Sequence, residues 1–114
     1  MLKTIHKISS WLLAALGVVH TALTPMFYGR LSVGSMWFAG SGIAMIAVGF
    51  LNIATSRHAG DFLLRILCYV INLLTVVFGI LIVTVDNEPQ VIFGLLLMIT
   101  ITATAFLLKE GGAG

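Results

Sequence analysis

The chain has 114 residues, of which 60% are hydrophobic and only 9% are charged, and its mean hydropathy is +1.14. A soluble globule of this size cannot hide so much apolar surface from water, so the composition excludes a soluble fold. The formal net charge of +2 becomes informative only when the basic residues are sorted by loop.

Four long apolar runs occupy nearly the whole chain, and Arg65 is the only charged residue inside any of them. As helices they would reach roughly 26 to 36 Å, against a hydrocarbon core of about 30 Å. Lipid offers the backbone no water, so helix is the expected state of each run. We predict an all-α polytopic membrane protein, a four-transmembrane-helix bundle with short loops that forms one integral membrane domain over residues 1–114. The predicted spans are Ile8–Thr24, Met36–Ala54, Phe62–Val85 and Val91–Leu108.

The basic residues divide unevenly between the two sides of a four-span zigzag. Only Arg30 falls on one side. The other side has Lys3, Lys7, Arg57, Arg65 and Lys109. By the positive-inside rule, both termini and the 55–61 loop are cytoplasmic. We therefore predict a multi-pass plasma (inner) membrane protein with this orientation.

The first run carries a polar stripe with a histidine at mid-membrane depth. Gly17, His20 and Thr24 recur at helical spacing on one face, and His6 extends this face toward the N-terminus. An ionisable group in the membrane is a functional candidate by default. We favour a packing role, in which the ring of His20 bonds Asn72, Thr24 or a carbonyl; proton or ligand handling is the alternative.

Glycines on the second run share a face with Asn52. Gly42 and Gly49 lie seven residues apart and have no side chain to hold neighbouring backbones away. We predict that they mark the close approach of this helix to its neighbours, and we assign Gly17 and Gly79 the same packing role.

The third run begins at Asp61, where a negative charge suits the helix dipole, and Arg65 follows at the favourable acid-before-base spacing. Counted from the cytoplasmic face, Asn72 lies roughly 15 Å and His20 roughly 18 Å deep, so the two are expected to touch. The same count, taken for Asn52 from the outer end of the second run, places Asn52 at the depth of Arg65. We interpret both asparagines primarily as interhelical contacts.

Polar side chains gather near the cytoplasmic face of these three runs. We assign five of them as candidate contacts to lipid headgroups: His6, Arg57, His58, Asp61 and Arg65. In the fourth run, Thr100, Thr102 and Thr104 scatter around the circumference, and their hydroxyls can bond carbonyls of their own helix. We therefore expect the fourth span to be the most lipid-exposed.

No catalytic residue, metal site or cofactor is predicted. A haem between helices needs two histidines at matching depth, whereas His6, His20 and His58 lie at a membrane edge, at mid-span and in a loop. His6 and His58 share a side, but no carboxylate or cysteine completes a recognisable metal-ligand set. The sequence also lacks a glycine-rich phosphate loop and a nucleophile elbow.

In length and number of spans the chain is similar to the small multidrug resistance transporters. That family centres on a glutamate in its first span, and the first run here has no carboxylate. A proton-coupled antiporter of that type is therefore disfavoured.

We expect a non-enzymatic accessory, scaffold or regulatory partner of another membrane component. Its expected partners are the lipid bilayer and either a second copy in a homo-oligomer or a larger membrane complex, with no nucleic acid. The alternative is a small transporter or channel whose pathway runs between the first three spans past His20 and Asn72. A third reading, an enzyme acting on a lipid, would use the cluster Arg57, His58, Asp61 and Arg65 as a headgroup site.

Overall fold

The computed structural model describes residues 1–110, and side chains as far as residue 108. Its helices are α1 (Leu2–Ala22), the short α2 (Thr24–Phe27), α3 (Val33–Arg57), α4 (Phe62–Val85) and α5 (Pro89–Glu110). The four long helices are long and apolar enough to cross a membrane, and residues 1–110 contain no strand. The predicted all-α, four-helix membrane bundle is confirmed. The Lys109 side chain and the C-terminus, which entered the topology prediction, lie outside the described part.

The first long helix begins and ends earlier than its apolar run predicts. It starts at Leu2, because amphipathic residues before Ile8 continue the same helix, and it ends at Ala22. Thr24 and Pro25 then open α2, where proline occupies the first turn and its missing N–H breaks no helical hydrogen bond.

A capping box moves the start of α3 three residues ahead of the predicted Met36. The Ser35 amide donates to Ser32 Oγ at 3.1 Å, and the Ser32 amide donates to Ser35 Oγ at 2.8 Å. These bonds satisfy amide groups that a helix start otherwise leaves unpaired. The last long helix likewise starts two residues early, at Pro89, because proline is favoured in a first turn.

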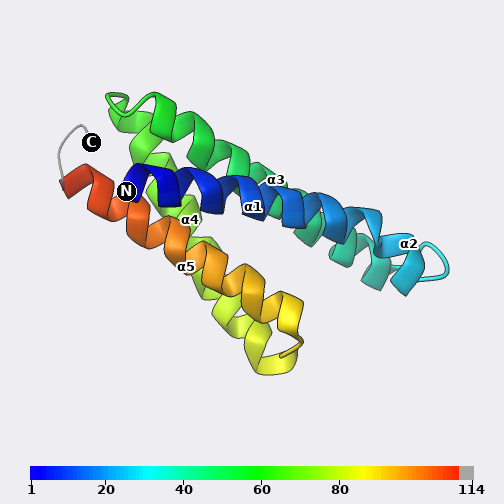
Figure 1. Ribbon diagram of the computed structural model, residues 1–114. Helices are drawn as coiled ribbons and strands as arrows, with labels where there is room; N and C mark the ends of the chain where they lie inside the picture. Colours follow the sequence, from blue (N-terminus) through cyan, green and yellow to red (C-terminus); the bar gives the residue numbers. More distant parts are fainter. Residues whose placement is uncertain (111–114) are drawn as a thin grey trace.

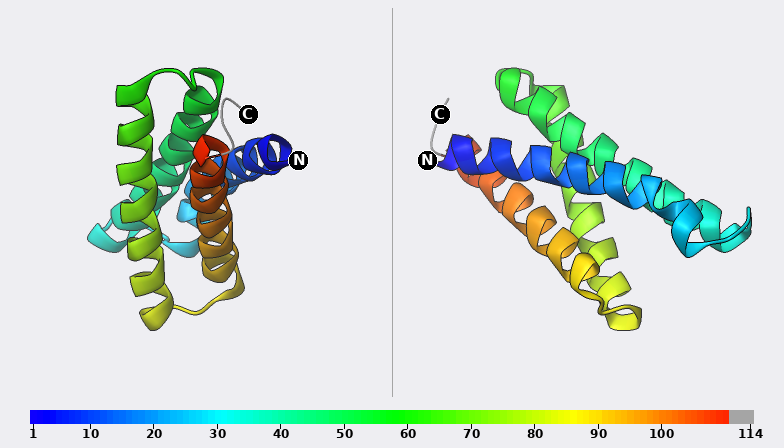
Figure 2. Two further views of the ribbon diagram at one scale, coloured as in Figure 1. Left: turned by 90° about the vertical axis from the view of Figure 1, so that its left-hand side faces the viewer. Right: turned by 45° about the vertical axis from the view of Figure 1, so that its right-hand side comes forward.

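The long helices form two antiparallel hairpins, α1 with α3 and α4 with α5, which meet at one end and diverge toward the other (Figures 1 and 2). The N-terminus, the α3–α4 loop and the end of α5 gather at the joined end. We call this the basic end, because Lys3, Lys7, Arg57 and Arg65 lie there, and we call the other the splayed end.

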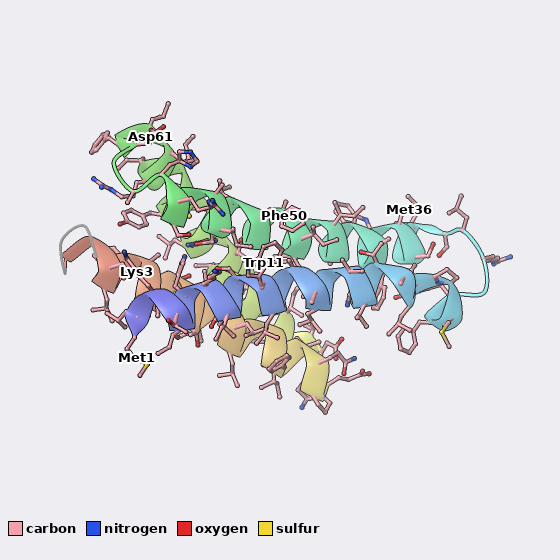
Figure 3. All side chains as sticks on the ribbon, turned by 45° about the horizontal axis from the view of Figure 1, so that its top comes forward. Met1, Lys3, Trp11, Met36, Phe50 and Asp61 are labelled. Carbon is pink, nitrogen blue, oxygen red and sulfur yellow. The ribbon has the colours of Figure 1, made fainter. Side chains whose placement is uncertain are left out.

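Glycines let α1 and α3 approach backbone to backbone. A Cβ atom added to Gly17 would lie 2.5 Å from the Gly42 carbonyl oxygen, and one added to Gly49 would lie 2.7 Å from the Ser10 carbonyl oxygen. Real Cβ atoms do not approach other atoms so closely. Trp11 and Phe50 meet edge to face beside this contact, with ring centroids 6.1 Å apart (Figure 3).

The apolar core lies where the hairpins meet, and α5 contributes most of it. Its buried members are Leu13, Val48, Leu97, Met98 and Ile101. The prediction that the fourth span is the most lipid-exposed is therefore wrong: the buried share of the apolar window is 22% in α5 but 11% in α4. Thr100 and Thr102 do bond carbonyls of their own helix, as expected. The exposure of the helix was nevertheless misjudged, because core-facing and lipid-facing positions of a membrane helix are equally apolar and hydropathy does not distinguish them. Gly79 of α4 faces Leu95 of α5, where an added Cβ would meet the flexible Cδ1 at 3.0 Å.

Substituting Gly42 or Gly49 by Leu should lower the free energy of unfolding by about 1–3 kcal/mol each, because the new side chain has no room between two backbones. Thermal unfolding in detergent, followed by circular dichroism, measures the loss. Gly40→Leu is the matched control, since Gly40 lies on the same helix with no atom within 4 Å of its added Cβ. Equal melting temperatures for all three variants would show that the α1–α3 contact can accommodate a large side chain, which contradicts the prediction.

Candidate functional site

A closed hydrogen-bond network joins the two hairpins. Asn52 Nδ2 donates to Asn72 Oδ1 at 2.7 Å, and Asn72 Nδ2 donates to Asn52 Oδ1 at 2.8 Å. Asn52 also donates to the Val48 carbonyl at 2.9 Å, and Cys68 Sγ donates to Asn52 Oδ1 at 3.2 Å. Both asparagines are fully buried. Every amide hydrogen therefore has a partner, which a polar group inside a membrane requires.

The predicted contact between His20 and Asn72 is wrong, because the Asn72 amide donates to Asn52 Oδ1 and Cys68 Sγ instead. Thr24 does not reach the imidazole either; its hydroxyl donates to the His20 backbone carbonyl at 3.3 Å. The depth count failed for two reasons. Helix α3 continues past Ala54 to Arg57, which moves Asn52 inward from the helix end, and the hairpins are inclined to each other (Figure 2).

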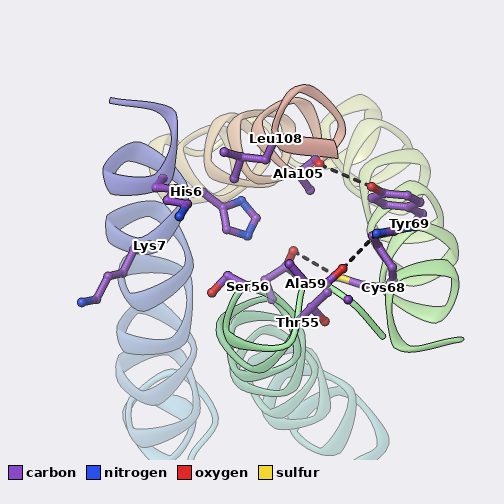
Figure 4. Close-up of a pocket in the computed structure, with 13 residues that line it drawn as sticks. His6, Lys7, Thr55, Ser56, Ala59, Cys68, Tyr69, Ala105 and Leu108 are labelled. Carbon is purple, nitrogen blue, oxygen red and sulfur yellow. Dashed lines mark hydrogen bonds between the residues drawn. The ribbon is translucent and has the colours of Figure 1, made fainter. Parts of the chain in front are cut away.

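A cavity of about 600 Å³ opens at the basic end beside this network (Figure 4). All four long helices contribute to its wall. Its polar side chains are Lys3, His6, Lys7, Asn52, Thr55, Ser56, Arg65, Cys68 and Tyr69, and none of the described residues lining it is acidic. A volume of this size lies within the range of small-molecule sites in proteins.

The cations of the cavity come from both hairpins. Arg65 of α4 donates from Nη1 to the Ala59 carbonyl at 2.9 Å, which anchors the guanidinium at the α3–α4 loop. Lys3 lines the wall from α1. Lys7 contributes its stem, since its ammonium group points away from the cavity in Figure 4. The wall therefore carries positive charge without a compensating carboxylate among its described residues.

His6 points from α1 toward α5 and is held there (Figure 4). Its Nδ1 lies 2.8 Å from Thr104 Oγ1, and that hydroxyl donates to the Thr100 carbonyl at 2.8 Å. Because a hydroxyl has one proton, this arrangement assigns Nδ1 as the donor. Ser10 adds a bond to the His6 carbonyl at 2.8 Å. His6 thus ties α1 to α5 in the wall of the cavity.

The other predicted headgroup candidates lie outside this wall. Asp61 caps α4 by accepting from the Leu64 amide at 3.0 Å, and among the described residues no ion pair joins it to Arg65. His58 Nδ1 lies 3.0 Å from the Ala54 carbonyl, and Arg57 is exposed in the last turn of α3. Sequence reasoning missed Lys3 and Tyr69 as site residues. Lys3 entered only as a topology charge, and nothing in the sequence distinguishes Tyr69 from a lipid-facing tyrosine.

His20 belongs to a second, smaller cavity of about 220 Å³ between the hairpins, toward the splayed end. Its ring stacks on Phe38 with centroids 3.8 Å apart and planes 19° apart. Nε2 is buried without a hydrogen-bond partner among the described residues, although the Phe38 backbone lies close to the ring. Apolar side chains dominate the rest of this wall, including Met45, Phe78 and Leu95.

Within the described residues no group of three or more histidine, cysteine or acidic side chains is placed to hold a metal ion. Cys68 is the one cysteine of the chain. Its thiol is buried and donates a hydrogen bond to Asn52 Oδ1. Buried, hydrogen-bonded thiols of this kind serve structure.

Replacing either asparagine of the network by Leu should lower the free energy of unfolding by about 1–2 kcal/mol, because the remaining amide loses its partner inside the bundle. The double variant Asn52→Leu/Asn72→Leu should lose less than the sum of the single losses, since no amide is then left unpaired. Thr100→Val is the control, because its hydroxyl bonds only its own helix. Additive losses in detergent melting would contradict a coupled pair.

Comparison of the chain with protein-family models, with curated proteins and with solved structures found no match. The function therefore has to be argued from the residues and their geometry.

Proposed function

We propose that this protein is a non-enzymatic accessory or regulatory component of a membrane, and that it binds an anionic lipid headgroup in the cavity at its basic end. The observation that carries the proposal is the charge of that cavity. Lys3 and Arg65 line it from opposite hairpins, and its described wall has no carboxylate. Unpaired basic side chains at a membrane face attract anionic headgroups, and arginine presents several N–H donors in a geometry that suits phosphate.

The orientation belongs to the same proposal. Lys3, Lys7, Arg57 and Arg65 lie at the basic end and Arg30 at the other, and the positive-inside rule then makes the basic end cytoplasmic in a plasma (inner) membrane. Anionic lipids of the cytoplasmic leaflet would lie at the level of the cavity. Arg30, Asp86 and Glu88, at the splayed end, would face outward.

A lipid-modifying enzyme has less support from the geometry. Such an enzyme was expected to use Arg57, His58 and Asp61 together with Arg65, but only Arg65 lines the cavity. In the described wall His6 is the one imidazole, the side chain most often used as a general acid or base, and its Nδ1 is already bonded to Thr104. Binding without turnover is therefore the simpler use of this site.

A small transporter is the second candidate, and the pair of cavities favours it. One cavity lies toward each end of the bundle, and a layer that includes Leu13, Asn52 and Met98 separates them. Passage would require the hairpins to move apart at the Asn52–Asn72 pair. Proton flux into vesicles that contain the purified protein tests this candidate, and wild-type vesicles no leakier than empty ones would exclude proton transport.

Anionic lipids should stabilise the protein and neutral ones should not. Dioctanoyl-phosphatidate and dioctanoyl-phosphatidylglycerol should raise the melting temperature in detergent, because a ligand that binds only the folded state adds roughly 2.7 kcal/mol at about a hundred times its Kd. Dioctanoyl-phosphatidylcholine should have no effect. Lys3→Gln/Arg65→Gln should lose most of the shift.

The matched control is Lys3→Gln/Arg57→Gln, which removes the same charge from the same end while keeping Arg65 in the cavity wall. It should lose less of the shift than Lys3→Gln/Arg65→Gln. Equal losses in the two double variants would mean that surface charge, and not the cavity, attracts the lipid.

The orientation predicts which loop an external reagent reaches. In spheroplasts, a membrane-impermeant maleimide should label Arg30→Cys and leave His58→Cys unlabelled, because the two residues lie at opposite ends of the bundle. Cys68 is buried and provides the unlabelled background. Labelling at residue 58 with protection at residue 30 would reverse the topology.

A further inference from the structure

We propose that the cavity at the basic end selects a headgroup that carries hydroxyl groups beside its phosphate, namely the phosphoglycerol group of a membrane lipid. This inference rests on the proposed function and names the ligand class of the same site. It rests on the hydroxyl groups in the cavity wall, in addition to the charge of that wall.

Two hydroxyls in the wall present oxygen lone pairs rather than protons. Thr55 Oγ1 donates to the Leu51 carbonyl at 2.7 Å, and Ser56 Oγ donates to the Ile53 carbonyl at 2.7 Å. Each hydroxyl has one proton and two lone pairs. With the proton committed to the helix backbone, each oxygen can act as an acceptor. The Thr55 side chain also interacts with the Cys68 thiol, so the exposed Ser56 oxygen is the acceptor open to a ligand. A ligand with hydroxyl groups supplies the donor that this acceptor requires.

A third hydroxyl comes from the facing hairpin. Tyr69 of α4 lines the same cavity, and its hydroxyl lies 3.5 Å from the Ala105 carbonyl of α5. Figure 4 shows Tyr69 across the cavity from Ser56. Hydroxyl oxygens thus stand on both α3 and α4 beside the wall that holds Arg65, so one ligand can meet the cation and the acceptors together.

The cations fix the other half of the ligand. Arg65 uses one N–H on the Ala59 carbonyl, and the guanidinium has five in all, so N–H donors remain for a phosphate. Lys3 adds an ammonium group from α1. A phosphoethanolamine headgroup would bring its own ammonium group into a wall whose described residues include no carboxylate. The wall therefore disfavours a zwitterion and favours a net negative headgroup.

The size of the cavity also argues against a bare phosphate. Its volume of about 600 Å³ corresponds to roughly 20 water molecules at about 30 Å³ each. A phosphate alone would leave the Ser56 oxygen to water. A phosphoglycerol group can occupy the space and reach both kinds of wall group.

The test compares two lipids that differ only in hydroxyl groups. Dioctanoyl-phosphatidylglycerol and dioctanoyl-phosphatidylpropanol both carry one phosphodiester charge and a three-carbon headgroup, but the propanol headgroup lacks hydroxyls. Titration calorimetry of the full chain in detergent should give a Kd about tenfold lower for the glycerol lipid, the equivalent of one or two hydrogen bonds.

Variants of the cavity wall test whether its hydroxyl groups cause the preference for the glycerol lipid. Ser56→Ala/Tyr69→Phe should bring the ratio of the two Kd values close to one by weakening binding of the glycerol lipid, whereas Arg65→Gln should weaken both lipids alike. Ser41→Ala is the control, since this serine has the same type of bond to its own helix but lines the other cavity. Retention of the wild-type ratio in Ser56→Ala/Tyr69→Phe would overturn the assignment.

The remaining outcomes separate this inference from the function on which it rests. Equal Kd values for the two lipids in the wild type would overturn hydroxyl selection and leave anionic lipid binding intact. Failure of both lipids to bind more tightly than phosphatidylcholine would overturn the proposed function itself. Free glycerol 3-phosphate binding as tightly as the glycerol lipid would show that the ligand is a soluble phosphoglycerol compound and overturn the lipid as its source.

Discussion

The reciprocal hydrogen bonds between the Asn52 and Asn72 amides join two hairpins that otherwise diverge. Apolar side chains gain nothing by leaving lipid for one another, so hydrophobic surface alone does not fix how two hairpins meet in a bilayer. An unpaired amide there is costly, and pairing requires one depth and one orientation. This pair therefore sets the level at which α3 meets α4. The cavity at the basic end lies directly beside this pair, with Asn52 in its wall.

Backbones approach more closely in the first hairpin than in the second. Gly17, Gly42 and Gly49 let α1 and α3 touch without side chains between them, and α1 also reaches α5 through His6 and Thr104. Helix α4 has fewer inward contacts and exposes most of its apolar surface. The bundle is thus a closely packed α1–α3 hairpin that α5 joins through α1. Helix α4 packs along its own hairpin partner α5 and meets α3 at the Asn72 amide.

The two ends of the bundle offer different chemistry. At the basic end, cations and hydroxyl oxygens line a roomy cavity, which suits a charged and hydroxylated headgroup. Toward the splayed end, the smaller cavity is mostly apolar, and the His20 ring is fixed by its stack on Phe38. Nε2 of that ring is buried without a hydrogen-bond partner among the described residues. This asymmetry is why binding at the basic end is the better supported function.

The sequence by itself determined the membrane class and the number of spans, because only a helix satisfies its backbone in lipid and hydropathy locates such helices directly. It also placed Asp61 at a helix start, where its side chain does cap α4. Tertiary structure decided which polar groups meet. Asn72 pairs with Asn52 and not with His20, because the helix ends and inclinations that set depth are fixed by capping and packing. Tertiary structure also decided which apolar residues form the core, since hydropathy does not distinguish Ile101 from a lipid-facing leucine. Lys3 and Tyr69 likewise became cavity residues only when distant segments came together, a placement that no local pattern encodes.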